Sequence, residues 1–169
     1  MTEQSKWDNS YGEAGFAYGT EPNDFLAASL HQLPPTGTVL CLADGEGRNS
    51  VFLAEHGYTV TAVDSSAVGL EKARALAAER GVAITTRNAD LADYPLPENT
   101  YDAIISIFCH LPPPVRRILH SQIPASLTKG GVFLLEGYTP RQLNYGTGGP
   151  PIKELLMELS DLQEELRQL

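Results

Sequence analysis

The segment best suited to bind a ligand is the glycine-rich stretch VLCLADGEGRNS, residues 39–50. An apolar run leads into Asp44 and Gly45, and a helical pattern starts just after Gly47. Glycines lack a Cβ, so the backbone can turn sharply and approach a ligand, while the first N–H groups of the helix remain free to donate hydrogen bonds. The stretch predicts a loop that binds a nucleotide-like ligand, and a plain strand-to-helix turn is the alternative.

Asp64 is the second candidate ligand group, and it stands 19 residues after Gly45. It ends the next apolar run, in TAVDSS, where a carboxylate can accept hydrogen bonds from both hydroxyls of a ribose. A helix cap is the alternative role for this aspartate. Because the two features have the spacing of one strand–helix–strand unit, together they favour ligand binding. Ser65, which follows in the same turn, is expected to join the contact.

A third carboxylate, Asp90, follows a further short run of strand-forming residues. It could accept the exocyclic amine of an adenine, with the backbone N–H of Leu91 donating to a ring nitrogen. A loop or helix-start aspartate is an equal alternative for Asp90 alone.

The chemistry of the loop indicates which nucleotide would bind. A dinucleotide fingerprint has a third glycine where this sequence has Ser50, and the carboxylates of Asp44 and Glu46 would repel a pyrophosphate. The same charges suit the cationic sulfonium and amino group of S-adenosylmethionine, which is therefore the expected cofactor. Ala43 and Arg48 complete the expected loop contacts. Arg48 could pair with the cofactor's carboxylate, although a solvent-facing arginine is an equal alternative.

His110 is the candidate catalytic residue. It follows the apolar run that ends at Ile107, and ligands in open α/β sheets lie beyond the carboxyl ends of the strands. Its imidazole could remove a proton from an acceptor, line the pocket, or only pack a loop. Ile107 is expected to line the cofactor site. Cys41 and Cys109 have no second Cys or His at ligand spacing, so both are predicted to be core thiols and no metal site is expected.

Strand-like and helix-like segments alternate along the chain and would hold these residues at one edge. Strands are expected over residues 38–42, 58–63, 82–86, 101–107 and 132–136, and helices over residues 46–56, 66–80 and 115–126. This alternation predicts an α/β fold, a doubly wound and mostly parallel sheet with helices on both faces.

The chain is long enough for one domain, and we expect a single one over residues 1–169. Residues 1–21 show no regular period and are expected to form an irregular arm or lid, while residues 22–169 form the α/β core. A short helix is expected from Pro22, and a longer helix over residues 152–169.

The net charge of -9 disfavours a nucleic-acid or membrane-surface role, because it repels nucleic-acid phosphates and anionic lipid heads, and only a local basic patch would be an exception. We expect no nucleic-acid partner and no membrane partner, while the oligomeric state stays open. The N-terminal residues carry no signal-peptide pattern, and no run approaches the roughly 18 apolar residues of a membrane span. A cytoplasmic location is expected.

The loop GEGRNSVFLAEHGYTVTAVDSS, the arm WDNSYGEAGFAYGTEPNDFL and the stretch KGGVFLLEGYTPRQL resemble class I S-adenosylmethionine-dependent methyltransferases. More narrowly, they resemble the small tellurite-resistance-type methyltransferases, whose first loop reads close to LDLGCGxGRN. The resemblance implies a Rossmann-like methyltransferase fold and methyl transfer to a small molecule or a metalloid oxyanion. It also implies that Tyr18 and Gly19 fold over the methionine end of the cofactor.

The sequence departs from this pattern in two places. Cys41 stands where the family usually has an acid, and Ala43 replaces the first glycine of the loop. The family's sheet commonly has two further strands, one antiparallel, and we expect these last strands to be missing from this chain. A nicotinamide-dependent oxidoreductase and a non-catalytic S-adenosylmethionine-binding module are the alternative functions.

Overall fold

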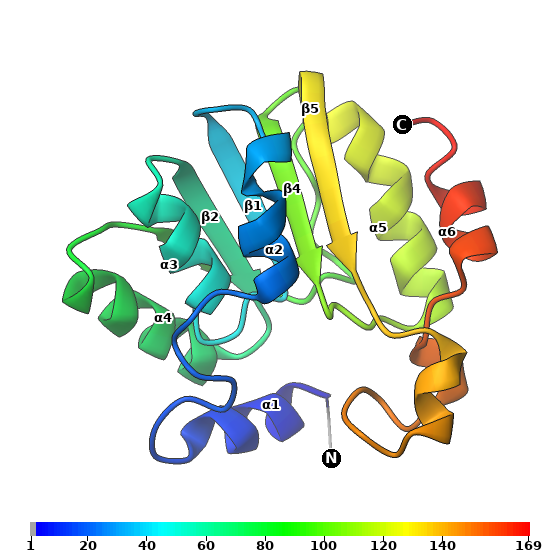
Figure 1. The fold of residues 1–169 in the computed structure, drawn as a ribbon, viewed down its shortest axis with the longest axis horizontal. Coiled ribbons are helices and arrows are strands. Elements are labelled where there is room, and N and C mark those ends of the chain that lie inside the picture. The colour runs from blue at the N-terminus through cyan, green and yellow to red at the C-terminus, as the bar shows by residue number, and fades with distance from the viewer. Residues whose placement is uncertain (1–2) are drawn as a thin grey trace.

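Five parallel strands form one sheet in the computed structural model, which describes residues 3–169 (Figure 1). The strand order is β3-β2-β1-β4-β5. The strands are β1 (Thr38–Leu42), β2 (Thr59–Asp64), β3 (Thr85–Asn88), β4 (Tyr101–Ile107) and β5 (Leu127–Glu136). The main helices are α1 (Glu3–Gly12), α2 (Asp24–Ser29), α3 (Arg48–Glu55), α4 (Ala67–Glu79), α5 (Pro113–Ser126) and α6 (Leu159–Glu165).

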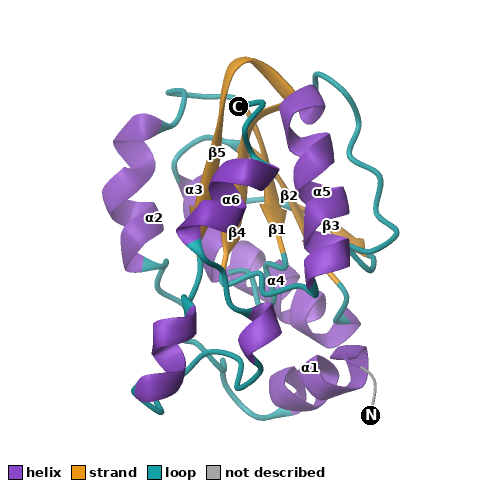
Figure 2. Ribbon diagram, turned by 90° about the vertical axis from the view of Figure 1, so that its right-hand side faces the viewer, coloured by secondary structure: helices purple, strands orange, loops and turns teal. Residues whose placement is uncertain are grey.

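The central strand β1 buries side chains on both faces of the sheet, as strands of parallel sheets do. Val39 and Cys41 belong to the apolar cluster under α2 and α3, whereas Leu40 and Leu42 belong to the cluster under α5. Figure 2 shows α2 and α5 on opposite sides of the strands. The predicted doubly wound α/β fold is thereby confirmed.

Most predicted elements occur close to their expected bounds, and β1 and β4 match them. The third strand begins later than predicted, at Thr85, because residues 82–84 connect α4 to the sheet. The last strand begins earlier, at Leu127, with a register shift against β4 between Tyr101 and Ala103. This irregularity hides the start of the strand from a period-two pattern.

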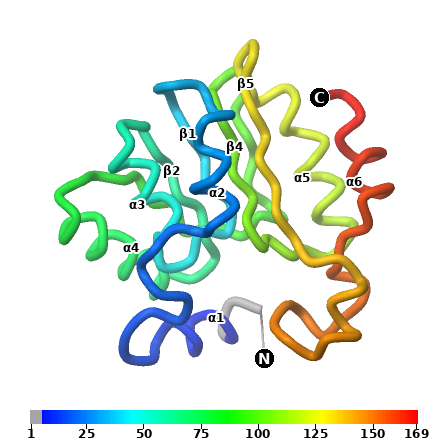
Figure 3. The backbone as a smooth tube through the Cα atoms, viewed as in Figure 1, coloured from blue at the N-terminus to red at the C-terminus, as the bar shows by residue number. Residues whose placement is uncertain are grey.

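The prediction of an irregular arm over residues 1–21 is wrong for residues 3–12, which form helix α1. Trp7 and Tyr11 stand four residues apart on this helix and stack with ring centroids 5.5 Å apart. Only these two large apolar side chains define its buried side, so the sequence shows little helical period. In Figure 3 the helix lies beyond the carboxyl ends of the strands.

The prediction of one helix over residues 152–169 is also wrong. The segment forms a short 3₁₀ turn, Lys153–Leu155, and the separate helix α6. Met157 is buried between them, and its N–H donates to the carbonyl of Tyr138 at 2.9 Å. This tertiary hydrogen bond replaces a helical one and divides the segment. Among residues 3–169, no helix has the length and apolar character that a membrane crossing requires.

Candidate active site

The loop after β1 makes the tight turn that its glycines predict. Gly45 and Gly47 have left-handed backbone, with φ of 60° and 90°. A Cβ on Gly47 would lie 2.7 Å from the Cα of Ala73, so α4 approaches the loop too closely for any side chain there. Ala43 adopts φ of 50° although it is not glycine. The loop is thus a rigid turn held between β1 and α4.

Asp44 fixes the start of α3. Its carboxylate accepts hydrogen bonds from the hydroxyl of Ser50 and, at 3.3 Å, from the backbone N–H of Ser50. The residue that replaces a dinucleotide-type glycine therefore serves as a partner for the acidic loop. Burial raises the pKa of Asp44 to about 6, although the hydrogen bonds from Ser50 oppose this shift.

Asp64 lies directly beside the glycine loop. One of its carboxylate oxygens accepts the N–H of Gly45 and the other accepts the N–H of Ser66, both at 2.8 Å. Burial raises the pKa of Asp64, and these backbone hydrogen bonds oppose the shift. The side chain therefore connects the loop after β1 to the end of β2.

The end of β3 meets the same edge. Ala89 donates its N–H to the carbonyl of Asp64 at 3.0 Å, and the side chain of Asn88 donates to the carbonyls of Asp64 and Ser65. Asp90 is exposed and accepts the N–H of Ala92, while Leu91 is buried. The structure thus brings all three predicted carboxylates to neighbouring strand ends.

Tyr11 of α1 covers this edge, a role that the sequence did not indicate. A Cβ on Gly45 would lie 2.6 Å from the hydroxyl of Tyr11, and one on Gly69 would lie 2.8 Å from its ring. Burial raises the pKa of Tyr11, and the nearby charge of Asp64 adds to the shift. Only the aromatic spacing of Trp7 and Tyr11 could have indicated this helix.

Asp8 and Lys72 are the other residues at this edge that sequence reasoning missed. The carboxylate of Asp8 in α1 accepts a hydrogen bond from the hydroxyl of Ser66, and the two oxygens lie 2.5 Å apart. Lys72 of α4 binds the carboxylate of Glu46 at 2.8 Å. Tyr18 and Gly19 are exposed, and the Tyr18 ring lies 5.8 Å from the guanidinium of Arg48.

His110 is engaged through both ring nitrogens. Its Nδ1 lies 2.8 Å from the carbonyl of Leu155, and its Nε2 accepts the N–H of Tyr138 at 3.3 Å. A carbonyl only accepts and an N–H only donates, so the ring is neutral with its proton on Nδ1. Burial lowers the pKa of His110 further. Ile107, just before it in the chain, is buried.

Cys41 and Cys109 are buried free thiols, as predicted. Burial raises the pKa of both, which leaves them uncharged at neutral pH. The described residues contain no group of three or more His, Cys, Asp or Glu side chains suited to hold a metal ion.

Comparison with known proteins identifies the family of this chain. Residues 39–131, more than half of the chain, match the methyltransferase domain family. The chain is a member of this family. A relative in Mycobacteroides abscessus, 2-heptyl-1-hydroxyquinolin-4(1H)-one methyltransferase, is 24% identical over 138 residues. That alignment covers 79% of this chain, which spans 61% of the relative's length.

Solved structures agree with the family match. An S-adenosylmethionine dependent methyltransferase from Mesorhizobium loti is 30% identical, with a TM-score of 0.59 over 68% of this chain and 52% of that chain. The DhpI-SAH complex has the same fold, with 21% identity and a TM-score of 0.69 over 98% of this chain and 84% of that chain.

The family match confirms the predicted methyltransferase family, and the S-adenosylmethionine-dependent methyltransferase and the SAH complex among the solved structures agree with the predicted cofactor. The nicotinamide-dependent alternative is set aside. The narrower resemblance to tellurite-resistance-type methyltransferases stays a prediction, as does each residue's contact with the cofactor.

Proposed function

We propose that this methyltransferase domain transfers a methyl group from S-adenosylmethionine to a small organic molecule. The observation that carries the proposal is the hydrogen bond between the Gly45 N–H and the Asp64 carboxylate, which joins two ligand-binding features of a methyltransferase family. Asp90 lies at the neighbouring strand end.

The residues at this edge have the chemistry that the cofactor needs. A carboxylate offers about four acceptor positions, so the two N–H donors on Asp64 leave capacity for ribose hydroxyls. The cofactor supplies an electrophilic methyl group on a cationic sulfur, and the carboxylate of Asp44 favours that charge. Further contacts are assigned to Ala43, Gly45, Gly47, Arg48, Ser65, Asp90, Leu91, Ile107, Tyr18 and Gly19.

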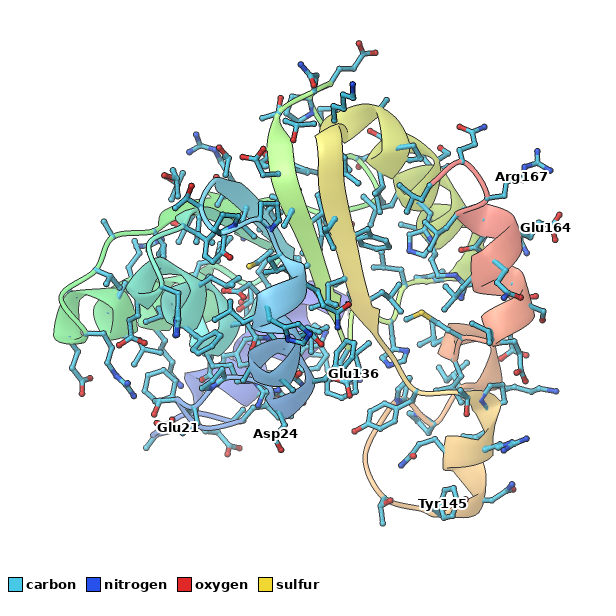
Figure 4. The ribbon with its side chains drawn as sticks, turned by 45° about the horizontal axis from the view of Figure 1, so that its top comes forward. Glu21, Asp24, Glu136, Tyr145, Glu164 and Arg167 are labelled. Carbon is cyan, nitrogen blue, oxygen red and sulfur yellow. The ribbon has the colours of Figure 1, made fainter. Side chains whose placement is uncertain are left out.

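Two features favour an organic acceptor over a metalloid oxyanion. A shallow groove lies beside the end of β5, and it is lined by Phe25, Leu135, Glu136, Gly137, Thr139, Met157, Leu159 and Leu162. Glu136 lies at the end of β5, between α2 and the C-terminal segment (Figure 4). A mostly apolar groove that also carries the carboxylate of Glu136 suits an apolar molecule better than an anion. The relative from M. abscessus is named for a heptyl-substituted hydroxyquinolone.

Calorimetry with S-adenosylhomocysteine tests the cofactor site. The wild-type protein should bind it and should not bind NAD. Asp64→Ala should weaken binding by about 1.5–3 kcal/mol, the range for hydrogen bonds to a charged group. Asp93→Ala, which removes an exposed carboxylate from the loop after β3, is the matched control and should bind normally.

Transfer of labelled methyl groups tests the activity itself. We expect turnover with an apolar organic acceptor, such as a hydroxyquinolone, and none with tellurite. Binding without turnover on any acceptor would instead support a non-catalytic module, and absence of S-adenosylhomocysteine binding would refute the proposed function.

A further inference from the structure

Residues 13–17 of the arm wrap around the ammonium group of Lys72, which projects from α4. Its Nζ donates to the carbonyls of Glu13 and Gly15 at 2.9 and 2.6 Å. The same atom lies 2.8 Å from Oε1 of Glu46 and 5.7 Å from the centre of the Phe16 ring. The ammonium group of Lys72 therefore holds this part of the arm against α4.

Glu46 completes the connection from the side of the glycine loop. Its other carboxylate oxygen accepts the backbone N–H of Ala17 at 2.7 Å. The Glu46 side chain is 4% exposed and that of Lys72 is 24% exposed. The loss of either partner would leave a largely buried charge uncompensated, so the pair is difficult to open. We call Glu46, Lys72 and residues 13–17 the latch.

The latch closes the arm over the proposed cofactor site. It lies between Tyr11, which covers Gly45, and Tyr18, which faces Arg48. Asp64 is 6% exposed, and Asp8 of α1 binds the hydroxyl of the adjacent Ser66. We therefore expect α1 to move before a ribose reaches the carboxylate of Asp64. For the same reason, the arm must open again before a cofactor bound beneath it can dissociate.

We propose that Glu46 and Lys72 are positioning residues that hold the arm over the bound cofactor and thereby slow its release. The inference rests on the proposed function, because it places S-adenosylmethionine beneath the arm. The pair touches neither reacting atom and acts through the arm backbone. The loop glutamate thus has a role besides its charge: it connects the cofactor loop to its cover.

A purely structural role for Lys72 makes a different prediction. Helix α4 packs through Leu70, Ala73 and Leu76, which are buried independently of the lysine. If the proposal holds, loss of the ammonium group lets the arm open and return Glu46 to water, so cofactor release speeds up by more than the loss of stability accounts for. If Lys72 only supports the fold, the melting temperature falls, and the dissociation rate of S-adenosylhomocysteine rises by no more than the loss of folding free energy explains.

The test compares Lys72→Met with Arg74→Met, which removes a cation of the same helix that binds Thr86 and not the arm. Two quantities are measured: hydrogen exchange of residues 13–19 without ligand, and the dissociation rate of S-adenosylhomocysteine. Lys72→Met should speed both, the dissociation by about tenfold, which corresponds to 1.4 kcal/mol. Arg74→Met should change neither. Lys72→Arg should restore part of the slow dissociation, since it keeps the charge.

The outcomes separate this proposal from the proposed function. Faster exchange of the arm with unchanged dissociation would overturn the positioning role, and so would unchanged exchange. Failure of the wild-type protein to bind S-adenosylhomocysteine would overturn the proposed function and this inference together. In that case the exchange measurement still decides whether Lys72 holds the arm. Glu46→Gln combined with Lys72→Met should add little to either single change, because both variants break one connection.

Discussion

Two residues without glycine's freedom adopt left-handed backbone where strands end at the site. Ala43 follows β1 with φ of 50°, and Phe108 follows β4 with φ of 53°. Such conformations cost about 1–3 kcal/mol each and persist only where the surrounding structure enforces them. The Phe108 N–H donates to the carbonyl of Glu136 at 2.8 Å, and its ring stacks on Tyr138 with centroids 4.7 Å apart. These contacts fix the second of the two turns.

Ala43→Gly should stabilise the protein by about 1 kcal/mol, because glycine removes the steric cost of a positive φ. Part of the gain is offset by the greater freedom of glycine in the unfolded chain. Urea unfolding at neutral pH measures the change. Ala75→Gly, at an exposed position in the interior of α4, is a control of opposite sign and should destabilise by about 1 kcal/mol. Destabilisation by Ala43→Gly would contradict the strain.

His110→Ala should lower the free energy of unfolding but should have little effect on kcat. It leaves the partly buried carbonyl of Leu155 and N–H of Tyr138 without this partner, at a cost of about 1 kcal/mol for each hydrogen bond. Because both nitrogens are engaged and the ring is neutral, we expect kcat to fall by less than about tenfold, below the usual contribution of a general base. A loss of several hundredfold in kcat, with unchanged affinity for the acceptor, would restore the role of base.

At the scale of elements, α6 is attached to α5 through one buried carboxylate. Glu165 accepts hydrogen bonds from Arg116 at 2.8 and 3.0 Å and lies 2.7 Å from Nδ1 of His120. The side chains of Arg116 and Glu165 are 3% and 7% exposed. Within the described residues, Nη1 of Arg116 has no hydrogen-bond partner. The guanidinium therefore depends on Glu165 for its compensation.

Glu165→Gln should destabilise the protein by about 3 kcal/mol, since it leaves the buried charge of Arg116 unbalanced. Glu164→Gln is the matched control, because this neighbour is exposed and points away from α5 (Figure 4). Urea unfolding measures both. Equal stability of the two variants would show that α6 is held by its leucines alone.

The effect of Glu165→Gln should also depend on pH. Burial alone would raise the pKa of Glu165, but hydrogen bonds and charge from Arg116 outweigh it and lower the pKa below its ordinary value of 4.5. A lowered pKa means that the carboxylate stabilises the folded state fully above pH 4.5, and that this contribution is lost as the pH falls through the folded-state pKa. The difference between wild type and variant should therefore shrink in acid.

At the scale of the whole molecule, the carboxylates at the two ends of the sheet have pKa values shifted in opposite directions. Those at the proposed cofactor site, Asp44 and Asp64, have a raised pKa because burial disfavours their charge. Asp102 has a lowered pKa because it accepts hydrogen bonds from the Thr38 N–H and the Thr128 hydroxyl, which join β4 to the starts of β1 and β5. The ionised carboxylates of the proposed site therefore lower the stability of the folded state. The ionised carboxylate of Asp102, at the opposite end of the sheet, raises it.

The sequence by itself determined the strands, most helices of the core and the edge where they end. An apolar run such as residues 38–42 and the periodic residues of α4 report local geometry, because side-chain alternation depends on neighbours within a few positions. The order of strands and helices then placed Gly45, Asp64 and Asp90 at neighbouring strand ends.

Only the tertiary structure decided how that edge is covered. Tyr11 contacts Gly45, Lys72 binds Glu13 and Gly15 of the arm, and His110 binds Leu155, each across 34 or more residues of chain. No periodic pattern encodes such pairs, because each depends on the path of the whole chain. For the same reason α1 was hidden and the C-terminal helix was overestimated: the packing partner, more than the local period, sets where each helix forms and ends.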